Sequence, residues 1–347
     1  MAKILYGVMG DASGHVGRAS AISTGMPHHE FLFLGGGRAR RLGSTGCRVE
    51  EIPMFSTCYS NNRVNVAATL SNGIRQLPKL SRTFETVVRI MADFQPDLVL
   101  SDYEFFTPIA ARRLGIRCIS IDHQHFLTKC YCPPVKGGRL SRFMFKMPLQ
   151  AMYSHTDHFM ITSFFPFYPK KPEKTEVFPP ILGRDITGFV PREGNHLLVY
   201  QTSPTFRRLL PVLRRIMRPC IVYGVEGGLS SGNIVFKRFS RNGFLDDLSS
   251  CRYAITNGGH NVISEALYFG KPVLSFPIHL AYEQYVNAHM LASLEYGACS
   301  ISPRPELGLF DAFEERLDRF RERIARGGSF FGTEKLIGRL EGAIREG

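Results

Sequence analysis

The sequence predicts an α/β fold with two doubly wound, mainly parallel sheets. The chain has 347 residues, more than one typical domain. Apolar runs bounded by turns alternate with helix-forming segments along most of its length, which is the rhythm of β-α-β units. That rhythm weakens across 163–195, where prolines and charges cluster, and then restarts. We therefore expect an N-terminal domain at 1–182, a linker at 183–192 and a C-terminal domain at 193–347.

Each expected domain is a succession of strand-like and helical segments. In the first, the apolar runs are KILYGVM, EFLFLG, DLVLSD and CISID, with helix-forming segments such as SAIS and PIAARRLGI between them. In the second, HLLVYQ, CIVYGV, NIVFKRF, YAIT and PVLSFP repeat the pattern. An apolar stripe at helical spacing indicates core packing near the end, through Phe313, Leu317, Phe320 and Ile324. The last helix could stay with the second domain or pack back on the first.

Composition excludes several classes of protein. Hydrophobic residues make up 44% and charged residues 21% of the chain, the values of an ordinary globular protein. Apolar runs fall short of the roughly 20 residues that span a bilayer, and the N-terminus enters a strand without a signal-peptide core, so we expect a cytoplasmic protein. The eight cysteines are scattered, and Cys130 and Cys132 are separated by one residue where zinc and redox pairs have two. We therefore expect free thiols and no metal site.

The net charge of +13 is concentrated in two stretches without acids. These are Lys129, Lys136, Arg139, Arg142 and Lys146, and then Arg207, Arg208, Arg214, Arg215 and Arg218. Such an excess attracts nucleic acid, anionic lipid or a phosphorylated ligand, and it is also typical of a solvated face. Because 129–147 is apolar as well as basic, it could rest on the inner face of the membrane, or be a loop helix packed on the sheet. Nucleic acid is not an expected partner, since no nucleic-acid motif accompanies these residues.

A glycine loop in the second domain is the strongest functional signal. The sequence NGGHN lies between the strand-like YAIT and the helix-forming segment that begins near Ser264. A helix N-terminus with glycines before it suits a diphosphate, so Asn257, Gly258, Gly259 and Asn261 are candidate phosphate contacts. Glu265, one turn later on the same helix, could accept hydrogen bonds from ribose hydroxyls. Glu283 and Gln284 follow the next strand and could hold sugar hydroxyls. The structural alternative is a turn followed by a surface glutamate.

From Thr256 through Ala288 the sequence resembles the donor-binding signature of the UDP-glycosyltransferases and the MurG-type enzymes. The segments NGGHNVISEA and EQYVNA are similar to those of a branch of small bacterial and archaeal glycosyltransferases. This resemblance implies the GT-B fold, in which two Rossmann-like domains face each other across a cleft, and a UDP-linked sugar donor without a metal or cofactor. It also implies that the helix N-terminus binds diphosphate, that Glu265 binds ribose, and that Glu283 and Gln284 bind the sugar.

Three further donor contacts come from the resemblance. Phe239 stands where the plant enzymes carry a tryptophan that stacks on uracil, and Asn242 stands where they carry a base-contacting glutamine. Ser203 lies where related enzymes place a hydroxyl against the donor phosphate. The sequence departs from the plant motif His-Cys-Gly-Trp, because it reads Asn257, Gly258, Gly259 and His260. The phosphate-binding histidine of that motif is absent, so Asn257 or His260 would have to act differently.

The first domain offers a general base. GDASGHVGRA is neither a dinucleotide fingerprint nor a P-loop, and it places His15 directly after the first strand. A neutral histidine can take a proton from a hydroxyl, and works better with a carboxylate that fixes its tautomer. Asp102, which ends DLVLSD at the same edge, is the candidate partner. This arrangement resembles that of the plant-type enzymes, in which a histidine after a glycine is the base and an aspartate orients it. The resemblance implies these roles for His15 and Asp102. A helix-capping aspartate and a structural histidine are the alternatives.

His123 and His125, after the strand CISID, are expected to line the acceptor site, whereas the alternative of zinc lacks a matching cluster. The loops at 54–80 and 123–147 should complete that site.

These residues lead to one principal hypothesis and two rivals. The chain is expected to be an inverting hexosyltransferase that moves sugar from a nucleotide-diphosphate donor to a hydroxyl, either lipid-linked or of a cell-envelope glycan. One rival is a UDP-sugar 2-epimerase of the same fold, although the acidic groups of such enzymes are missing around NGGHNV. The other rival is a noncatalytic protein that holds nucleotide sugars or anionic ligands.

Overall fold

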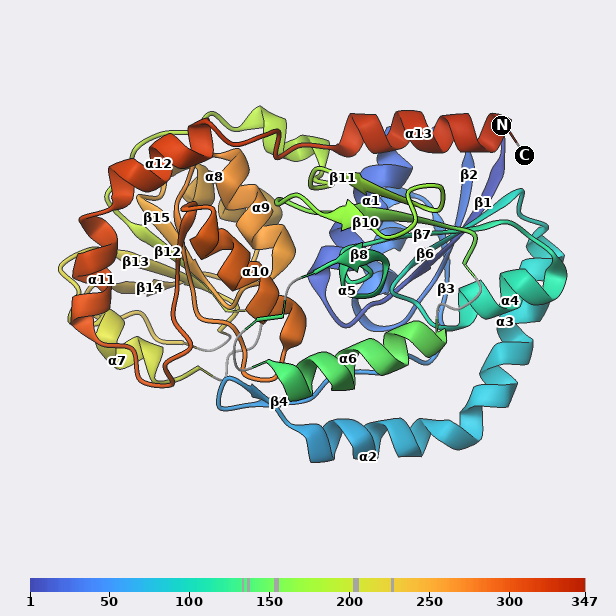
Figure 1. Cartoon of the computed structure of the whole chain (residues 1–347), viewed down its shortest axis with the longest axis horizontal. Coiled ribbons are helices and arrows are strands. Elements are labelled where there is room, and N and C mark those ends of the chain that lie inside the picture. The colour runs from blue at the N-terminus through green and yellow to red at the C-terminus, as the bar shows by residue number, and fades with distance from the viewer. Residues whose placement is uncertain (133, 136–137, 153–155, 202–205, 226–227, 347) are drawn as a thin grey trace.

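Two parallel β-sheets, each covered by helices, form two domains that lie against each other (Figure 1). The computed structural model describes residues 1–132, 134–135, 138–152, 156–201, 206–225 and 228–346. The two-domain α/β class predicted from the alternating pattern is therefore confirmed.

The first sheet has seven parallel strands in the order β11-β9-β7-β6-β1-β2-β3. Its strands are β1 (Lys3–Val8), β2 (Glu30–Leu34), β3 (Arg48–Glu50), β6 (Leu98–Asp102), β7 (Cys118–Asp122), β9 (His158–Thr162) and β11 (Thr175–Phe178). The chain begins in the middle of the sheet, runs to one edge and then returns past β1 to the other. The point where the direction reverses, beside β1, is where open α/β sheets bind ligands at their carboxyl ends.

The connections of this domain are helices and two short antiparallel ribbons. The ribbons are β4 (Tyr59–Ser60) with β5 (Arg63–Val64), and β8 (Cys130–Tyr131) with β10 (Tyr168–Pro169). The helices are α1 (Ser13–Gly25), η1 (Gly37–Thr45), α2 (Val66–Gln76), η2 (Leu77–Lys79), α3 (Leu80–Phe94), α4 (Phe106–Leu114), α5 (Phe126–Lys129) and α6 (Arg139–Met152). The basic and apolar stretch 129–147 thus contains a helix, α6.

The second sheet has six parallel strands in the order β14-β13-β12-β15-β16-β17, which is the same winding rule. Its strands are β12 (Leu197–Tyr200), β13 (Cys220–Tyr223), β14 (Ile234–Phe236), β15 (Tyr253–Thr256), β16 (Val273–Ser275) and β17 (Gly297–Cys299). Its helices are α7 (Leu209–Leu213), α8 (Arg241–Ser250), α9 (His260–Tyr268), α10 (Tyr282–Ser293), α11 (Leu307–Glu314) and α12 (Leu317–Ala325). The predicted apolar stripe is buried here but spans two helices, because the chain bends between α11 and α12.

The chain passes between the domains twice. The first crossing contains the short helix η3 (Arg184–Gly188). In the second, the chain leaves α12 and ends in α13 (Thr333–Arg345), which packs against α1 (Figure 1). Leu336, Ile337 and Leu340 of α13 share a core with Ile4 and Tyr6 of β1. The last helix therefore completes the core of the first domain.

The two domains also share apolar contacts. One core cluster contains Phe126 and Phe165 from the first domain together with Ile263, Tyr282 and Val286 from the second. Burial of this kind is the main favourable term in holding domains together, at about 25 cal/mol for each Å² removed from water. The carboxyl edges of the two sheets meet beside this cluster.

Candidate functional site

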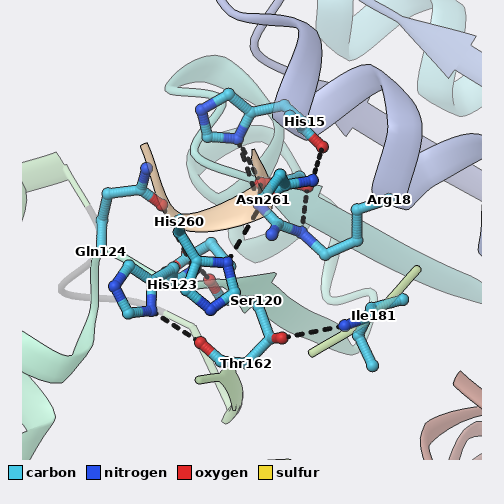
Figure 2. A network of polar contacts seen from close by, with 12 residues as sticks. His15, Arg18, Ser120, His123, Gln124, Thr162, Ile181, His260 and Asn261 are labelled. Atoms are coloured by element: carbon cyan, nitrogen blue, oxygen red, sulfur yellow. Dashed lines mark hydrogen bonds and ion pairs between the residues drawn. The ribbon is translucent and has the colours of Figure 1, made fainter. Parts of the chain in front are cut away.

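His15 and Asp102 meet at the carboxyl edge of the first sheet. Asp102 is the last residue of β6 and pairs in register with Val8, the last residue of β1. After Val8 the chain loops into α1, which carries His15 (Figure 2). The Nδ1 atom of His15 lies 2.6 Å from Oδ1 of Asp102. Both side chains are buried. The structure thus brings together the two residues that the sequence offers as base and orienter.

Tyr103 packs against the His15 ring of this pair. Its ring stacks on that of His15, with centroids 5.8 Å apart, and on that of Phe145 from α6 at 6.2 Å. Its backbone φ is +55°, which is uncommon for a bulky residue and is often found where a fold holds a functional group in place. Through this stack, α6 packs over the histidine.

A third charged residue, Arg18, belongs to the same cluster and escaped the sequence analysis. Its Nε atom donates to Oδ2 of Asp102 at 2.7 Å, and its second guanidinium nitrogen donates to Oδ1 at 2.8 Å. That nitrogen also lies 3.3 Å from Nδ1 of His15. Arg18 follows His15 by three residues, and residues three apart lie on the same face of a helix. This spacing is the sequence feature that could have pointed to Arg18.

His125 forms a second buried histidine–aspartate pair. Its Nδ1 atom lies 2.5 Å from Oδ2 of Asp122, and the Ser120 hydroxyl donates to the same oxygen at 2.8 Å. Burial alone would raise the pKa of Asp122, but the facing His125 and these hydrogen bonds bring it well below its usual range. His125, predicted for the acceptor site, is thus held within its own domain.

His123 instead faces the second domain. Its Nδ1 atom lies 2.7 Å from the Thr162 carbonyl oxygen, and its Nε2 atom lies 2.7 Å from Oδ1 of Asn287 on α10. Its ring stacks on His260, with centroids 4.0 Å apart. A neutral imidazole has one N–H to give, so the two oxygens compete for it. Burial lowers the pKa of His123, and burial with the neighbouring charges lowers that of His260 further.

The predicted diphosphate loop lies where the two domains meet. Gly258 has φ +88°, and a Cβ there would come within 2.9 Å of the Gln284 carbonyl oxygen, so the loop requires glycine. Gly259 precedes α9 as its N-cap. The Asn261 amide donates to the Gly14 carbonyl oxygen at 3.1 Å, and the Asn257 amide donates to Asn62 at 3.1 Å. Both asparagines therefore contact the first domain.

Glu265 is buried one turn further along α9, where it pairs with an arginine. The Arg241 guanidinium donates to its Oε1 atom at 2.5 Å and to Oδ2 of Asp185 at 2.6 Å. Burial raises the pKa of Glu265, and Arg241 counteracts that rise. Asp185 belongs to η3 in the first crossing between the domains. Through Arg241, the residue proposed to bind ribose, Glu265, is therefore connected to this crossing segment. The sequence analysis found neither Arg241 nor Asp185.

Glu283 and Gln284 lie in the first turn of α10, beside this loop. The Gln124 side-chain amide of the first domain donates to Oε2 of Glu283 at 3.0 Å. Oε1 of Gln284 accepts from the Ile278 backbone N–H at 3.0 Å, which leaves the Nε2 donors of Gln284 for other partners. The pair is therefore held from both sides of the domain boundary.

The proposed base-binding residues follow β14, the edge strand of the second sheet. Phe239 is 48% exposed and its ring packs against Tyr200, Tyr223 and Phe244. Asn242 is exposed in the first turn of α8. Ser203 lies outside the described residues.

One group within the described ranges has side chains spaced for a metal ion, and it lies on the outer side of the first domain. It comprises His28, His29 and Glu341. The Ala2 backbone N–H donates to Nδ1 of His29, which places the proton of the neutral ring on Nε2, toward Glu341. That tautomer favours a hydrogen bond to α13 over metal ligation. In the same ranges, no helix is both long and apolar enough to cross a bilayer.

Comparison with known proteins identifies the family. The model of glycosyl transferase family 1 matches residues 2–311. The chain belongs to this family. An uncharacterized glycosyltransferase of Methanosarcina mazei is 26% identical over 383 residues, covering 99% of this chain and 97% of the relative. An uncharacterized glycosyltransferase of Methanosarcina acetivorans is 24% identical over 377 residues, covering 98% and 95%.

Solved structures support the same fold for this family 1 chain. MurG of Acinetobacter baumannii covers 98% of this chain and 99% of its own, with a TM-score of 0.65 and 16% identity. A UDP-glucosyltransferase of Polygonum tinctorium covers 100% and 99%, with a TM-score of 0.69 and 14% identity. The resemblance to GT-B glycosyltransferases and the GT-B fold are therefore confirmed, and the family makes the chain a glycosyltransferase.

Proposed function

We propose that this glycosyltransferase is an inverting enzyme that transfers a hexose from a UDP-sugar to an acceptor hydroxyl. The observation that carries the proposal is the 2.6 Å contact between His15 and Asp102, directly across from the N-terminus of α9. Asn261, in the first turn of α9, donates to the carbonyl oxygen of Gly14, the residue before His15. A base and a phosphate-binding helix end thus share one small region.

In the proposed reaction, His15 acts as general base. Asp102 accepts a hydrogen bond from Nδ1–H of the imidazole, and the proton stays on Nδ1. The unprotonated Nε2 atom then takes the proton of the acceptor hydroxyl. The deprotonated oxygen forms a bond to the anomeric carbon as the bond to the diphosphate oxygen breaks. Attack from the face opposite the diphosphate inverts the anomeric configuration. General base catalysis of this kind contributes about 10²–10⁴-fold to a rate.

The leaving diphosphate would be stabilised by backbone N–H groups around Gly259 to Asn261 at the start of α9. A well-placed donor of this kind is worth about 3 kcal/mol in the transition state. Glu265 would bind ribose, Phe239 would stack on the base with Asn242 beside it, and Glu283 with Gln284 would bind the sugar. Transfer is expected to proceed without a divalent ion, so a chelator should leave the rate unchanged.

The first experiment is thermal denaturation of the purified protein with UDP, TDP, GDP and ADP, repeated for Glu265→Ala. A ligand that binds only the folded state raises the melting temperature by mass action. Stabilisation by UDP that is lost in the variant supports the donor site. Equal stabilisation of the variant would contradict the role of Glu265, and a different preferred diphosphate would replace UDP. The anomeric configuration of the product, read by NMR, then tests inversion.

A lipid-linked acceptor is a further part of the proposal. Helix α6 exposes Phe143, Met144 and Met147 while Lys146 and Arg142 lie along it. Burial and repulsion from Lys146 lower the pKa of Lys170 on the β8–β10 ribbon, so this surface favours anions. Residues 133, 136 and 137 of the predicted 129–147 stretch lie outside the described part. An apolar and basic surface of this kind is typical of proteins that rest on anionic bilayers.

Sedimentation with vesicles tests this surface. Binding is expected to phosphatidylglycerol-containing vesicles and not to pure phosphatidylcholine, and it should weaken in Phe143→Ser/Met147→Ser. Met217→Ser, at another exposed apolar residue, is the matched control. Equal binding by all three proteins would contradict the proposed contact.

A further inference from the structure

Arg18 is a charged side chain in the interior of the protein, and its burial needs a physical explanation. It is 2% exposed, and Asp102 is completely buried. Burying two charges costs free energy that their attraction recovers only with good geometry. Here the guanidinium spans both oxygens of Asp102, the fork geometry that arginine forms best with a carboxylate.

The same fork brings a positive charge to the base. Oδ1 of Asp102 accepts from Arg18 at 2.8 Å and lies 2.6 Å from Nδ1 of His15, so one oxygen serves both. The guanidinium nitrogen on that oxygen is 3.3 Å from the same Nδ1 atom. A like charge at this distance disfavours the protonated imidazole, while Asp102 favours it. Arg18 therefore opposes the effect that an isolated aspartate would have.

We propose that Arg18 is a positioning residue that fixes the Asp102 carboxylate and keeps His15 neutral, with its Nδ1–H directed to Asp102 and Nε2 available as base. The catalytic meaning of this inference rests on the proposed transferase function. The electrostatic inference itself concerns the cluster alone and can be tested without donor or acceptor.

Other ionisable groups face this cluster and define the background against which Arg18 acts. Tyr6 of β1 interacts electrostatically with Asp102 and Arg18, and burial followed by the Asp102 charge raises its pKa well above the usual value, so it stays neutral. Burial, with Glu283 and Asp122 beyond it, raises the pKa of Tyr103 in the same direction. Asp102 and Arg18 are thus the charges in direct contact with His15 in the part of the chain that the structure describes.

The positive charge of Arg18 reaches the other histidines at the domain boundary. It adds to the effect of burial in lowering the pKa of His123 and of His260. Burial and Arg18 therefore both favour the neutral form of the His123 and His260 rings at the domain boundary.

NMR of histidine-labelled protein tests the inference directly. Ring ¹⁵N shifts report both the tautomer and the protonation of each imidazole, and His15→Gln assigns the signal that disappears. In Arg18→Gln, the titration of His15 should move to higher pH by about one unit or more, a tenfold change in its protonation equilibrium. Arg18→Lys keeps the charge and should move it much less. Arg38→Gln is the control and should leave the titration unchanged, because Arg38 is an exposed arginine of η1 that contacts Ser13, at the start of the helix that carries His15.

A second comparison covers the case in which Arg18→Gln leaves Asp102 unpaired and unfolds the protein. Asp102→Asn and the double variant Arg18→Gln/Asp102→Asn both lack the buried carboxylate. Their His15 titrations should differ in the same direction, higher in the double variant. Equal titrations in these two, or an equal shift in Arg18→Lys and Arg18→Gln, would overturn the inference.

Activity separates this inference from the proposed function. With a donor found by the diphosphate screen, Arg18→Gln should lower kcat at acidic pH, move the acidic limb of the rate profile upward and leave KM for the donor unchanged. If the NMR shift is observed and transfer is absent from the wild type, the electrostatic inference stands and the transferase proposal fails.

Discussion

The two sheets follow the same winding rule, yet their polar groups find partners in different places. At the carboxyl edge of the first sheet, His15 pairs with Asp102 and His125 pairs with Asp122, all within one domain. At the edge of the second sheet, the Asn261 amide bonds to Gly14 across the boundary. The same holds for Asn257 with Asn62, Glu283 with Gln124 and Asn287 with His123.

This difference indicates that the polar groups of the two domains have different roles. Pairs held inside one domain keep their geometry whether or not the domains separate, which is what a base needs. Groups that are satisfied by the opposite domain must exchange those hydrogen bonds for bonds to a ligand. We therefore expect the first edge to be preorganised and the second edge to be adaptable. Four predictions break or sharpen this comparison.

The largest effect is expected at the preorganised edge. His15→Ala removes the proposed base, so transfer should fall by about 10²–10⁴-fold. Stabilisation by the preferred diphosphate should stay as in the wild type, because the proposed donor-binding groups lie on the second domain. Rates from product formation and melting curves from the same preparation check both parts. Full turnover by this variant would remove His15 as the base.

A smaller loss is expected at the edge of the second sheet, at the proposed ribose-binding residue Glu265. Glu265→Ala should weaken diphosphate binding by about 10–100-fold, the value of one or two hydrogen bonds to a charged acceptor. Titration calorimetry with the diphosphate measures it. Glu334→Ala removes an exposed glutamate that pairs with Arg184 and is the matched control. Equal weakening in both variants would indicate a general loss of folding.

A small gain is expected where the boundary competes with the ligand. Gln124→Ala frees Glu283 from its partner in the first domain. Because that hydrogen bond contributes about 1 kcal/mol, binding of a UDP-sugar should tighten by up to about fivefold. Fluorescence or calorimetric titration of donor into both proteins measures the ratio. Weaker binding would show that Gln124 itself contacts the donor.

The smallest effect is a change in the dependence of stability on pH. Burial, followed by the charges of His123 and Arg18, lowers the pKa of His260 well below 6.5 in the folded protein. Below pH 6.5, His260 binds a proton in the unfolded chain but stays neutral in the folded protein. The free energy of unfolding should therefore fall as the pH drops through 6.5. Melting temperatures across this range should fall less in His260→Gln than in the wild type.

His28→Gln is the control for this prediction, because the His28 side chain is 60% exposed. An equally steep fall in wild type, control and His260→Gln would assign the pH dependence to other groups.

The sequence could predict the residues that chain order and sheet edges determine. The runs ending at Val8 and Asp102 are strands whose carboxyl ends meet, so a base after one and a carboxylate after the other must lie close. The same reasoning places Asn261 and Glu265 on one face of α9. Arg18 was missed because an arginine in a helix is expected to be solvated.

Contacts across the boundary could not be predicted in this way. The pairing of Arg241 with Glu265 and Asp185 depends on where η3 passes, and the contact of Gln124 with Glu283 depends on how the domains meet. Strand periodicity carries no information about either. They follow instead from packing among residues far apart in the chain, which a local pattern does not encode.

The return of α13 to the first domain determines how the molecule would respond to force. Both chain ends lie together (Figure 1), and His29 links the Ala2 backbone to Glu341 of α13. The second domain is therefore an inserted loop in mechanical terms. A pull on the two ends would load β1 and α13 first, and the second domain would carry no tension until these two elements separate.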